Sequence, residues 1–92
     1  MPRTQTPQFS IGDVFITRAI HEFITHDEIF DLLELHTHGY WDEMDPEDIA
    51  ANELSVEKGY RVFSTYHVRS HKIWVITEWD RSVTTLLFPH EY

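Results

Sequence analysis

The spacing of apolar residues changes at Gly59, and this change limits the fold more than any other feature of the sequence. Before Gly59, apolar residues recur every three or four positions, as on one face of a helix; after it, β-branched and aromatic residues form short continuous runs, as in strands. A chain of 92 residues has room for one hydrophobic core. The sequence therefore predicts a single α+β domain over residues 9–92, preceded by a flexible tail over residues 1–8.

Two N-terminal capping signals predict a short helix and then a longer one. Thr17 can cap the short helix, and Thr25 with Glu28 three positions later has the capping-box pattern that begins the longer one. One stripe of the longer helix, at helical spacing, consists of Ile29, Leu32, Leu33 and His36. The acidic residues of this helix fall on the opposite side, so we expect a surface helix with an acidic outer face.

The segment Glu34–Asp48 contains two histidines and several carboxylates, and it has two interpretations. In the first, Gly39 ends one helix, and Asp45–Pro46 begins the next, which Gly59 ends in the same way. Histidines in a last helical turn are favoured, when partly protonated, by the helix dipole. In the second, His36 and His38 bind a divalent ion such as zinc together with nearby carboxylates. Residues two apart on a helix point about 200° apart, which favours the first interpretation.

Four segments have strand-like composition. One precedes the helices, over residues 12–17, and three follow them, over residues 60–68, 72–79 and 83–88. The second and third are separated by a connection short enough for a hairpin. We therefore predict a three- to four-stranded antiparallel sheet with two to three helices packed on one face.

The net charge of −9 is unevenly distributed along the chain. Between His21 and Glu57 there are twelve acidic residues and no lysine or arginine. Nucleic-acid binding needs a basic surface, whereas an acidic surface suits a basic protein partner or mimicry of a polyanion. The predicted partner-binding residues on this acidic face are Asp27, Asp31, Glu34, Asp42, Glu43, Glu47 and Asp48.

A second polar cluster falls near the C-terminus. Glu78, Asp80 and Arg81 concentrate at one turn, where Arg81 can pair with either acid and fix the hairpin. Together with Trp41, they also form a possible second contact patch, since tryptophan is a favoured anchor at interfaces. The sequence leaves open whether the tryptophans belong to the core or to an interface: Trp41, Trp74 and Trp79.

Several kinds of chemistry lack the residues that they need. The chain has no cysteine and only three glycines, so neither a thiolate site nor a glycine-rich phosphate loop is expected. No serine lies in a nucleophile-elbow pattern, and no apolar run approaches the roughly 20 residues that span a bilayer. We therefore expect a cytoplasmic, non-catalytic protein without a cofactor or metal.

Two other classes of function stay open. A small-ligand or metal-dependent enzyme would use His36 and His38 with the cluster of Glu78, Asp80 and Arg81. A structural homo-oligomer would use the uncovered face of the sheet or an open edge, where unpaired backbone groups can add another strand.

Three segments carry a recognisable pattern: HTHGYW, AANELSVEKGYRVFSTYHV and KIWVITEWDRSVTTLLFPHEY. The positions that carry it are His36, Gly39 and Trp41; Gly59 and Arg61; Tyr66; residues 76–81; Thr84 and Thr85; and Pro89 and Tyr92. In these features, residues 30–92 resemble a family of small bacterial proteins that are frequent on plasmids and integrated elements. Tyr40 and Asp42 depart from the residues that relatives tend to have there, aspartate and glycine.

Members of that family are described as plasmid-related proteins or as modification subunits of type I restriction systems. A methyltransferase subunit needs a glycine-rich cofactor motif that this chain lacks, so the resemblance implies an association with restriction loci rather than that activity. We expect an accessory or inhibitor protein of a mobile genetic element. Its partner would be a restriction, CRISPR or other DNA-handling enzyme with a basic surface, which the protein would bind by mimicking DNA. The protein itself would bind neither nucleic acid nor membrane.

Overall fold

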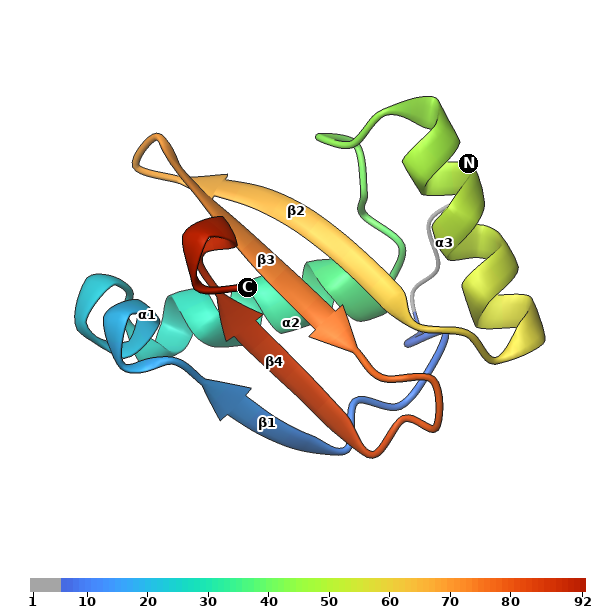
Figure 1. Ribbon diagram of the computed structural model, residues 1–92, viewed down its shortest axis with the longest axis horizontal. Helices are drawn as coiled ribbons and strands as arrows, with labels where there is room; N and C mark the ends of the chain where they lie inside the picture. Colours follow the sequence, from blue (N-terminus) through green and yellow to red (C-terminus); the bar gives the residue numbers. More distant parts are fainter. Residues whose placement is uncertain (1–5) are drawn as a thin grey trace.

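The computed structural model describes residues 6–92 as a four-stranded sheet with three α-helices (Figure 1). The elements, in chain order, are β1 (Asp13–Ile16), α1 (Arg18–Phe23), α2 (His26–Thr37), α3 (Pro46–Lys58), β2 (Val62–Val68), β3 (His71–Thr77), β4 (Val83–Leu87) and the 3-10 helix η1 (Pro89–Glu91). Residues 1–5 of the predicted tail lie outside the described residues. Gln8, the last residue of the predicted tail, donates its backbone N–H to the carbonyl of Thr37 at 2.8 Å.

The sheet is mixed, with strand order β1-β4-β3-β2. β2, β3 and β4 are antiparallel neighbours, whereas β1 runs parallel to β4. The predicted α+β class is confirmed, but the prediction of a purely antiparallel sheet is wrong at β1. Strands joined by short turns run antiparallel. Three helices and two strands separate β1 from β4, so β4 can lie beside β1 in either the parallel or the antiparallel direction. Hydrophobic periodicity does not specify which of the two directions is adopted.

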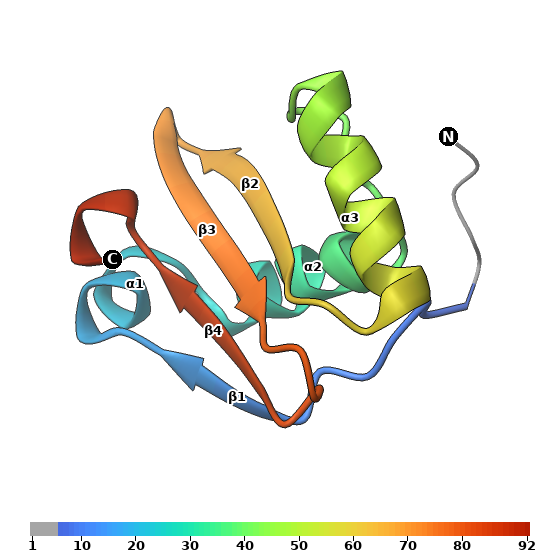
Figure 2. The same cartoon turned by 45° about the vertical axis from the view of Figure 1, so that its right-hand side comes forward.

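The two faces of the sheet differ. Figures 1 and 2 show α2 running behind the sheet, with α1 near the end of β1 and α3 beside β2. The buried core joins α1 and α2 to the sheet through Ile20, Ile24, Ile29, Leu32, Leu33, Trp41, Val62, Tyr66, Ile73, Val75 and Leu86. The opposite face carries no helix in the described part of the chain apart from η1, which lies against β3. The core is therefore a single layer between the sheet and the helices.

α3 covers the outer edge of β2 rather than the middle of the sheet. The buried side chain of Asn52 donates to the carbonyl of Phe63 at 2.7 Å and accepts from its N–H at 3.0 Å. One amide group thus supplies the two hydrogen bonds that a neighbouring strand would supply at this position. The edge of β2 is closed there by a side chain, as edge strands in soluble proteins commonly require.

The predicted helix boundaries are confirmed. The capping and left-handed residues that the sequence indicated are present at Thr17, Thr25 with Glu28, Gly39 and Gly59. Asp45 precedes α3 as expected, but its side chain makes no capping hydrogen bond. Local sequence therefore fixes where the helices start and stop.

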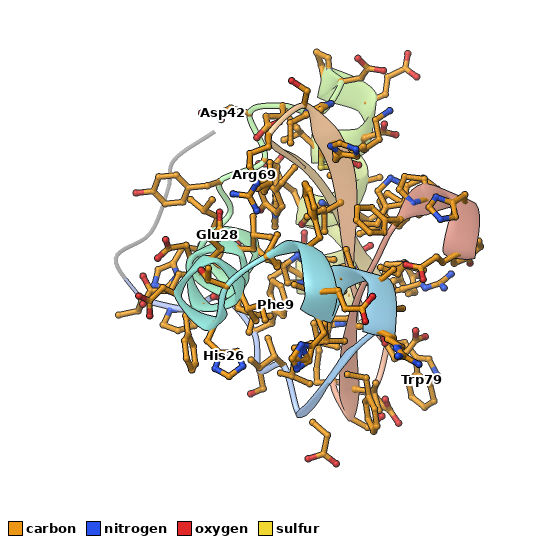
Figure 3. The ribbon with its side chains drawn as sticks, turned by 90° about the vertical axis from the view of Figure 1, so that its left-hand side faces the viewer. Phe9, His26, Glu28, Asp42, Arg69 and Trp79 are labelled. Carbon is orange, nitrogen blue, oxygen red and sulfur yellow. The ribbon has the colours of Figure 1, made fainter. Side chains whose placement is uncertain are left out.

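The β2–β3 hairpin is tied to the first turn of α2 (Figure 3). Arg69 and Ser70 both have positive φ, as in the two-residue turns that match the twist of a hairpin. Arg69 donates to the carboxylate of Glu28 at 2.7 Å and to the carbonyl of Phe23 at 2.7 Å. The hydrogen bond from Arg69 to the carboxylate of Glu28 is the main reason that the pKa of Glu28 falls to about 2. The capping residue of α2 therefore also anchors the hairpin.

Candidate functional site

The predicted acidic residues are all exposed, and we call them together the acidic surface: Asp27, Asp31, Glu34, Asp42, Glu43, Glu47 and Asp48. The first three lie on successive turns of α2, opposite the buried stripe that the sequence indicated. Asp42 and Glu43 follow in the loop between α2 and α3, and the last two form the first turn of α3. Figure 3 places Asp42 well away from α2, so the acidic surface is an extended band rather than a compact patch.

Five members of the acidic surface lack a side-chain partner among residues 6–92: Asp27, Asp31, Glu34, Glu47 and Asp48. Glu43 pairs with His67 at 2.5 Å. The ion pairs of the arginines use other acids, namely Arg18 with Glu22, Arg61 with Glu78 and Arg69 with Glu28. Within residues 6–92, the arginine ion pairs therefore neutralise acids outside the acidic surface and leave these five carboxylates exposed to solvent.

The predicted second contact patch is not assembled. Trp41 has an exposed fraction of 0%, and its indole N–H donates to the carbonyl of His36, so its assignment to a contact patch is wrong. Asp80 accepts two hydrogen bonds from Ser82, which lower its pKa. Of the other two tryptophans, Trp74 is half-buried and Trp79 is exposed.

Arg81 pairs with neither of the acids that flank it. It donates to the carbonyl of Tyr60 at 2.6 Å and to that of Ser55 at 3.0 Å, and its guanidinium lies over the ring of Phe9. Burial lowers its pKa. Ser55 belongs to the last turn of α3, so Arg81 acts as a cap that ties this helix end to the β3–β4 loop.

The sequence interpretation missed a buried polar chain that starts at His36. Its Nδ1 lies 2.5 Å from the hydroxyl of Ser64, and its Nε2 lies 2.8 Å from the hydroxyl of Thr77. The hydroxyls of Thr77 and Thr84 are 2.7 Å apart, and Thr84 donates to the carbonyl of Ile11 at 2.8 Å. The four side chains have an exposed fraction of 0%.

The direction of these bonds follows from counting protons, because each hydroxyl donates once. Thr84 donates to Ile11, so Thr77 must donate to Thr84. The Nε2 of His36 must then carry a proton and donate to Thr77. Burial, assisted by the charge of Arg81, lowers the pKa of His36 to about 3. The imidazole is therefore neutral, and its Nδ1 accepts from the hydroxyl of Ser64. The expectation of a partly protonated His36 at the helix end is wrong.

This buried chain has the residue types of a nucleophile and base but not the access. Both ring nitrogens of His36 are occupied by hydroxyls in the interior, and His38 turns its Nδ1 to the carbonyl of Glu34 instead. The two histidines therefore do not converge on one position. In the part of the chain that the structure describes, no three His, Asp or Glu side chains gather as a metal site.

Fold and surface together define a small α+β domain with a sealed polar core and an acidic helical surface. Comparisons with protein-family models, with curated proteins and with solved structures found no match. No α-helix within residues 6–92 has both the length and the apolar character to cross a membrane.

One feature of the sequence could have predicted the buried hydrogen-bonded chain at His36. A histidine within an apolar stripe needs polar partners from elsewhere in the fold.

Proposed function

We propose that this protein is a non-catalytic binding module whose acidic surface enters the basic, DNA-binding groove of a DNA-handling enzyme. The observation that carries the proposal is a set of five carboxylates along α2 and the first turn of α3 that have no side-chain partner within residues 6–92. Within the described residues, the arginines in ion pairs use other acids: Arg18 pairs with Glu22, Arg61 with Glu78 and Arg69 with Glu28. An unneutralised band of one sign suits a partner of the opposite sign.

The spacing of these charges agrees with mimicry of a nucleic-acid backbone. Asp27, Asp31 and Glu34 follow each other at about one per helical turn, or roughly 5 Å along the axis of α2. DNA presents one phosphate per about 3.4 Å along each strand, so the two rows of negative charge have spacings of the same order. Carboxylates on a rigid helix would replace phosphates without the entropy cost of ordering a flexible segment.

The biological setting of the proposal rests on the resemblance to small proteins of plasmids and integrated elements. An element that enters a bacterial cell meets restriction, CRISPR and other DNA-handling enzymes, which hold DNA in basic grooves. An acidic protein that occupies such a groove would act as an accessory or inhibitor protein for the element. The competing enzyme hypothesis is weakened because His36, its central residue, is sealed in the core with both nitrogens bonded.

The test compares two sets of charge reversals in pull-downs from a bacterial lysate. In the first variant, Asp31, Glu34, Glu47 and Asp48 are all changed to Lys. In the control, Glu53 and Glu57, which are exposed on α3 outside the acidic surface, are changed to Lys, with half the change in net charge. We expect the wild type and the control to capture a DNA-handling enzyme at about 50 mM salt and to lose it at about 500 mM, as polyanion contacts do. Added duplex DNA should displace the protein.

The four-site variant should capture no such enzyme while keeping its fold, because none of the four carboxylates has a side-chain partner in the described structure. Circular dichroism and thermal melting check that the fold survives. Capture that persists after the four reversals, or that does not weaken with salt, would show that the acidic surface is not the binding surface.

A further inference from the structure

β1 is an edge strand of the sheet (Figure 2). Half of its backbone groups therefore point away from β4. The N–H of Asp13 bonds to Ser82 and the N–H of Thr17 bonds to Leu86, both towards β4. Backbone groups alternate in direction along a strand, so Phe15 also faces β4, whereas the N–H and C=O groups of Val14 and Ile16 face outwards. Unlike the edge of β2, which Asn52 closes, this edge has no described side chain bonded across it.

Apolar side chains surround this open edge. Val14, Phe15 and Phe30 are exposed by 36%, 56% and 66%, although they are large hydrophobic residues. Val14 and Phe30 line two adjoining grooves between β1 and α2, of about 470 Å³ and 290 Å³. Leu33 lies at the floor shared by both grooves. An open strand edge beside an apolar groove is the arrangement that accepts an additional strand.

We propose that the added strand is β1 of a second copy of this chain, paired antiparallel about a two-fold axis at Phe15. That register places Val14 of each copy opposite Ile16 of the other, and these are the residues with free backbone groups. Each of the two pairs exchanges two hydrogen bonds, which gives four in total. Phe15 meets its own counterpart on the face of the sheet without α-helices, and two four-stranded sheets become one of eight strands.

Charge complementarity supports a second copy as the occupant. In this register, Asp13 of one chain lies opposite Thr17 of the other, next to Arg18. Arg18 is the sole Lys or Arg between residues 4 and 57. Its side chain is 91% exposed, and among residues 6–92 it pairs only with the exposed Glu22. The two-fold axis therefore brings an acid and a base together twice. A two-fold dimer needs such a self-complementary surface.

The register makes a cross-linking prediction that uses the absence of cysteine from the chain. In the F15C variant, the two cysteines would face each other in a non-hydrogen-bonded pair with Cα atoms about 4.5 Å apart, within the range that a disulfide spans. The matched control is L54C, since Leu54 on α3 is also exposed, by 48%. We expect F15C to form a disulfide dimer at least ten times faster than L54C under mild oxidation at equal concentration. Equal or slower cross-linking of F15C would overturn the proposal.

A charge-pairing experiment tests the two-fold axis without covalent trapping. F15E and F15K should each sediment as monomers, because like charges then face each other, and an equimolar mixture should restore the dimer. A wild-type protein that stays monomeric at about 100 µM, or a dimer that persists in both single variants, would overturn the proposed interface. Capture of a foreign protein by F15C in place of its own copy would assign the edge to another strand.

Ionic strength separates this interface from the acidic surface. Each copy carries a net charge of −9, so two copies repel. Salt also screens the two exposed contacts between Asp13 and Arg18, but exposed pairs contribute little, so screening of the net repulsion should strengthen the dimer. Binding of a basic partner by the acidic surface should weaken under the same change. A dimer that dissociates as salt rises from about 50 to 500 mM would contradict the apolar, strand-paired interface.

Discussion

Acidification from pH 7.5 to 5.0 should destabilise this protein through His36. The imidazole of His36 is neutral in the folded protein because burial lowers its pKa to about 3. In the unfolded chain the imidazole recovers an ordinary pKa of about 6.5. Between these two values the unfolded state binds the additional proton. Stability from this group is therefore complete above about pH 6.5 and is lost as the pH falls towards 3.

The size of the effect follows from the same two values. Each pH unit below 6.5 costs about 1.4 kcal/mol, so at pH 5.0 the loss is ~2 kcal/mol. Domains of this size are stable by roughly 5–15 kcal/mol in total, so this loss would be readily measured. Urea unfolding at the two pH values can be followed by tryptophan fluorescence, because Trp41 is buried and bonded to the backbone of His36.

Two variants isolate the contribution of His36 from other titrating groups. H36Q removes the imidazole, so its loss of stability between pH 7.5 and 5.0 should be ~2 kcal/mol smaller than that of the wild type. S64A removes one partner of the same imidazole, so it should lower stability at both pH values by about 1–3 kcal/mol while keeping a similar dependence on pH. If the wild type and H36Q lose the same stability on acidification, the reasoning about a neutral buried His36 is refuted.

Two further predictions concern stability and use the same unfolding assay. Gly12 and Gly59 both have positive φ, but a Cβ at Gly12 would lie 2.2 Å from the carbonyl oxygen of Ser82, whereas one at Gly59 would meet nothing within 4 Å. We therefore expect G59A to cost roughly 1–2 kcal/mol and G12A distinctly more, and equal costs would contradict the close packing of the β1 and β4 starts. N52A should cost about 1–3 kcal/mol because both backbone groups of Phe63 lose their partner, and a cost below about 0.5 kcal/mol would show that water replaces it.

Much of the fold was predictable because it depends on interactions between near neighbours in the sequence. The capping box of Thr25 and Glu28 joins residues three apart, and Gly39 and Gly59 end helices through their own backbone conformation. The apolar stripe of α2 identified its buried face, and with it the exposure of the acidic residues. Charge at the surface is also readable from sequence, since ionised side chains rarely lie in a core without a partner.

The parts that were not predictable depend on residues distant in the sequence. The sequence left open whether Trp41 belongs to the core or to an interface, and only the fold shows it buried against the backbone of His36. Arg81 has acids beside it in the sequence, yet it bonds to carbonyls more than twenty positions away.

The sequence by itself therefore determined the α+β class, the limits of the helices, and an acidic outer side along α2 and α3, because local hydrogen bonding and side-chain periodicity decide these features. Tertiary structure alone decided the parallel pairing of β1, the neutral state of His36 and the open edge at Val14 and Ile16. These three depend on which distant strands become neighbours. A pattern with a period of two or 3.6 residues says which side of an element is buried, but not what lies against it.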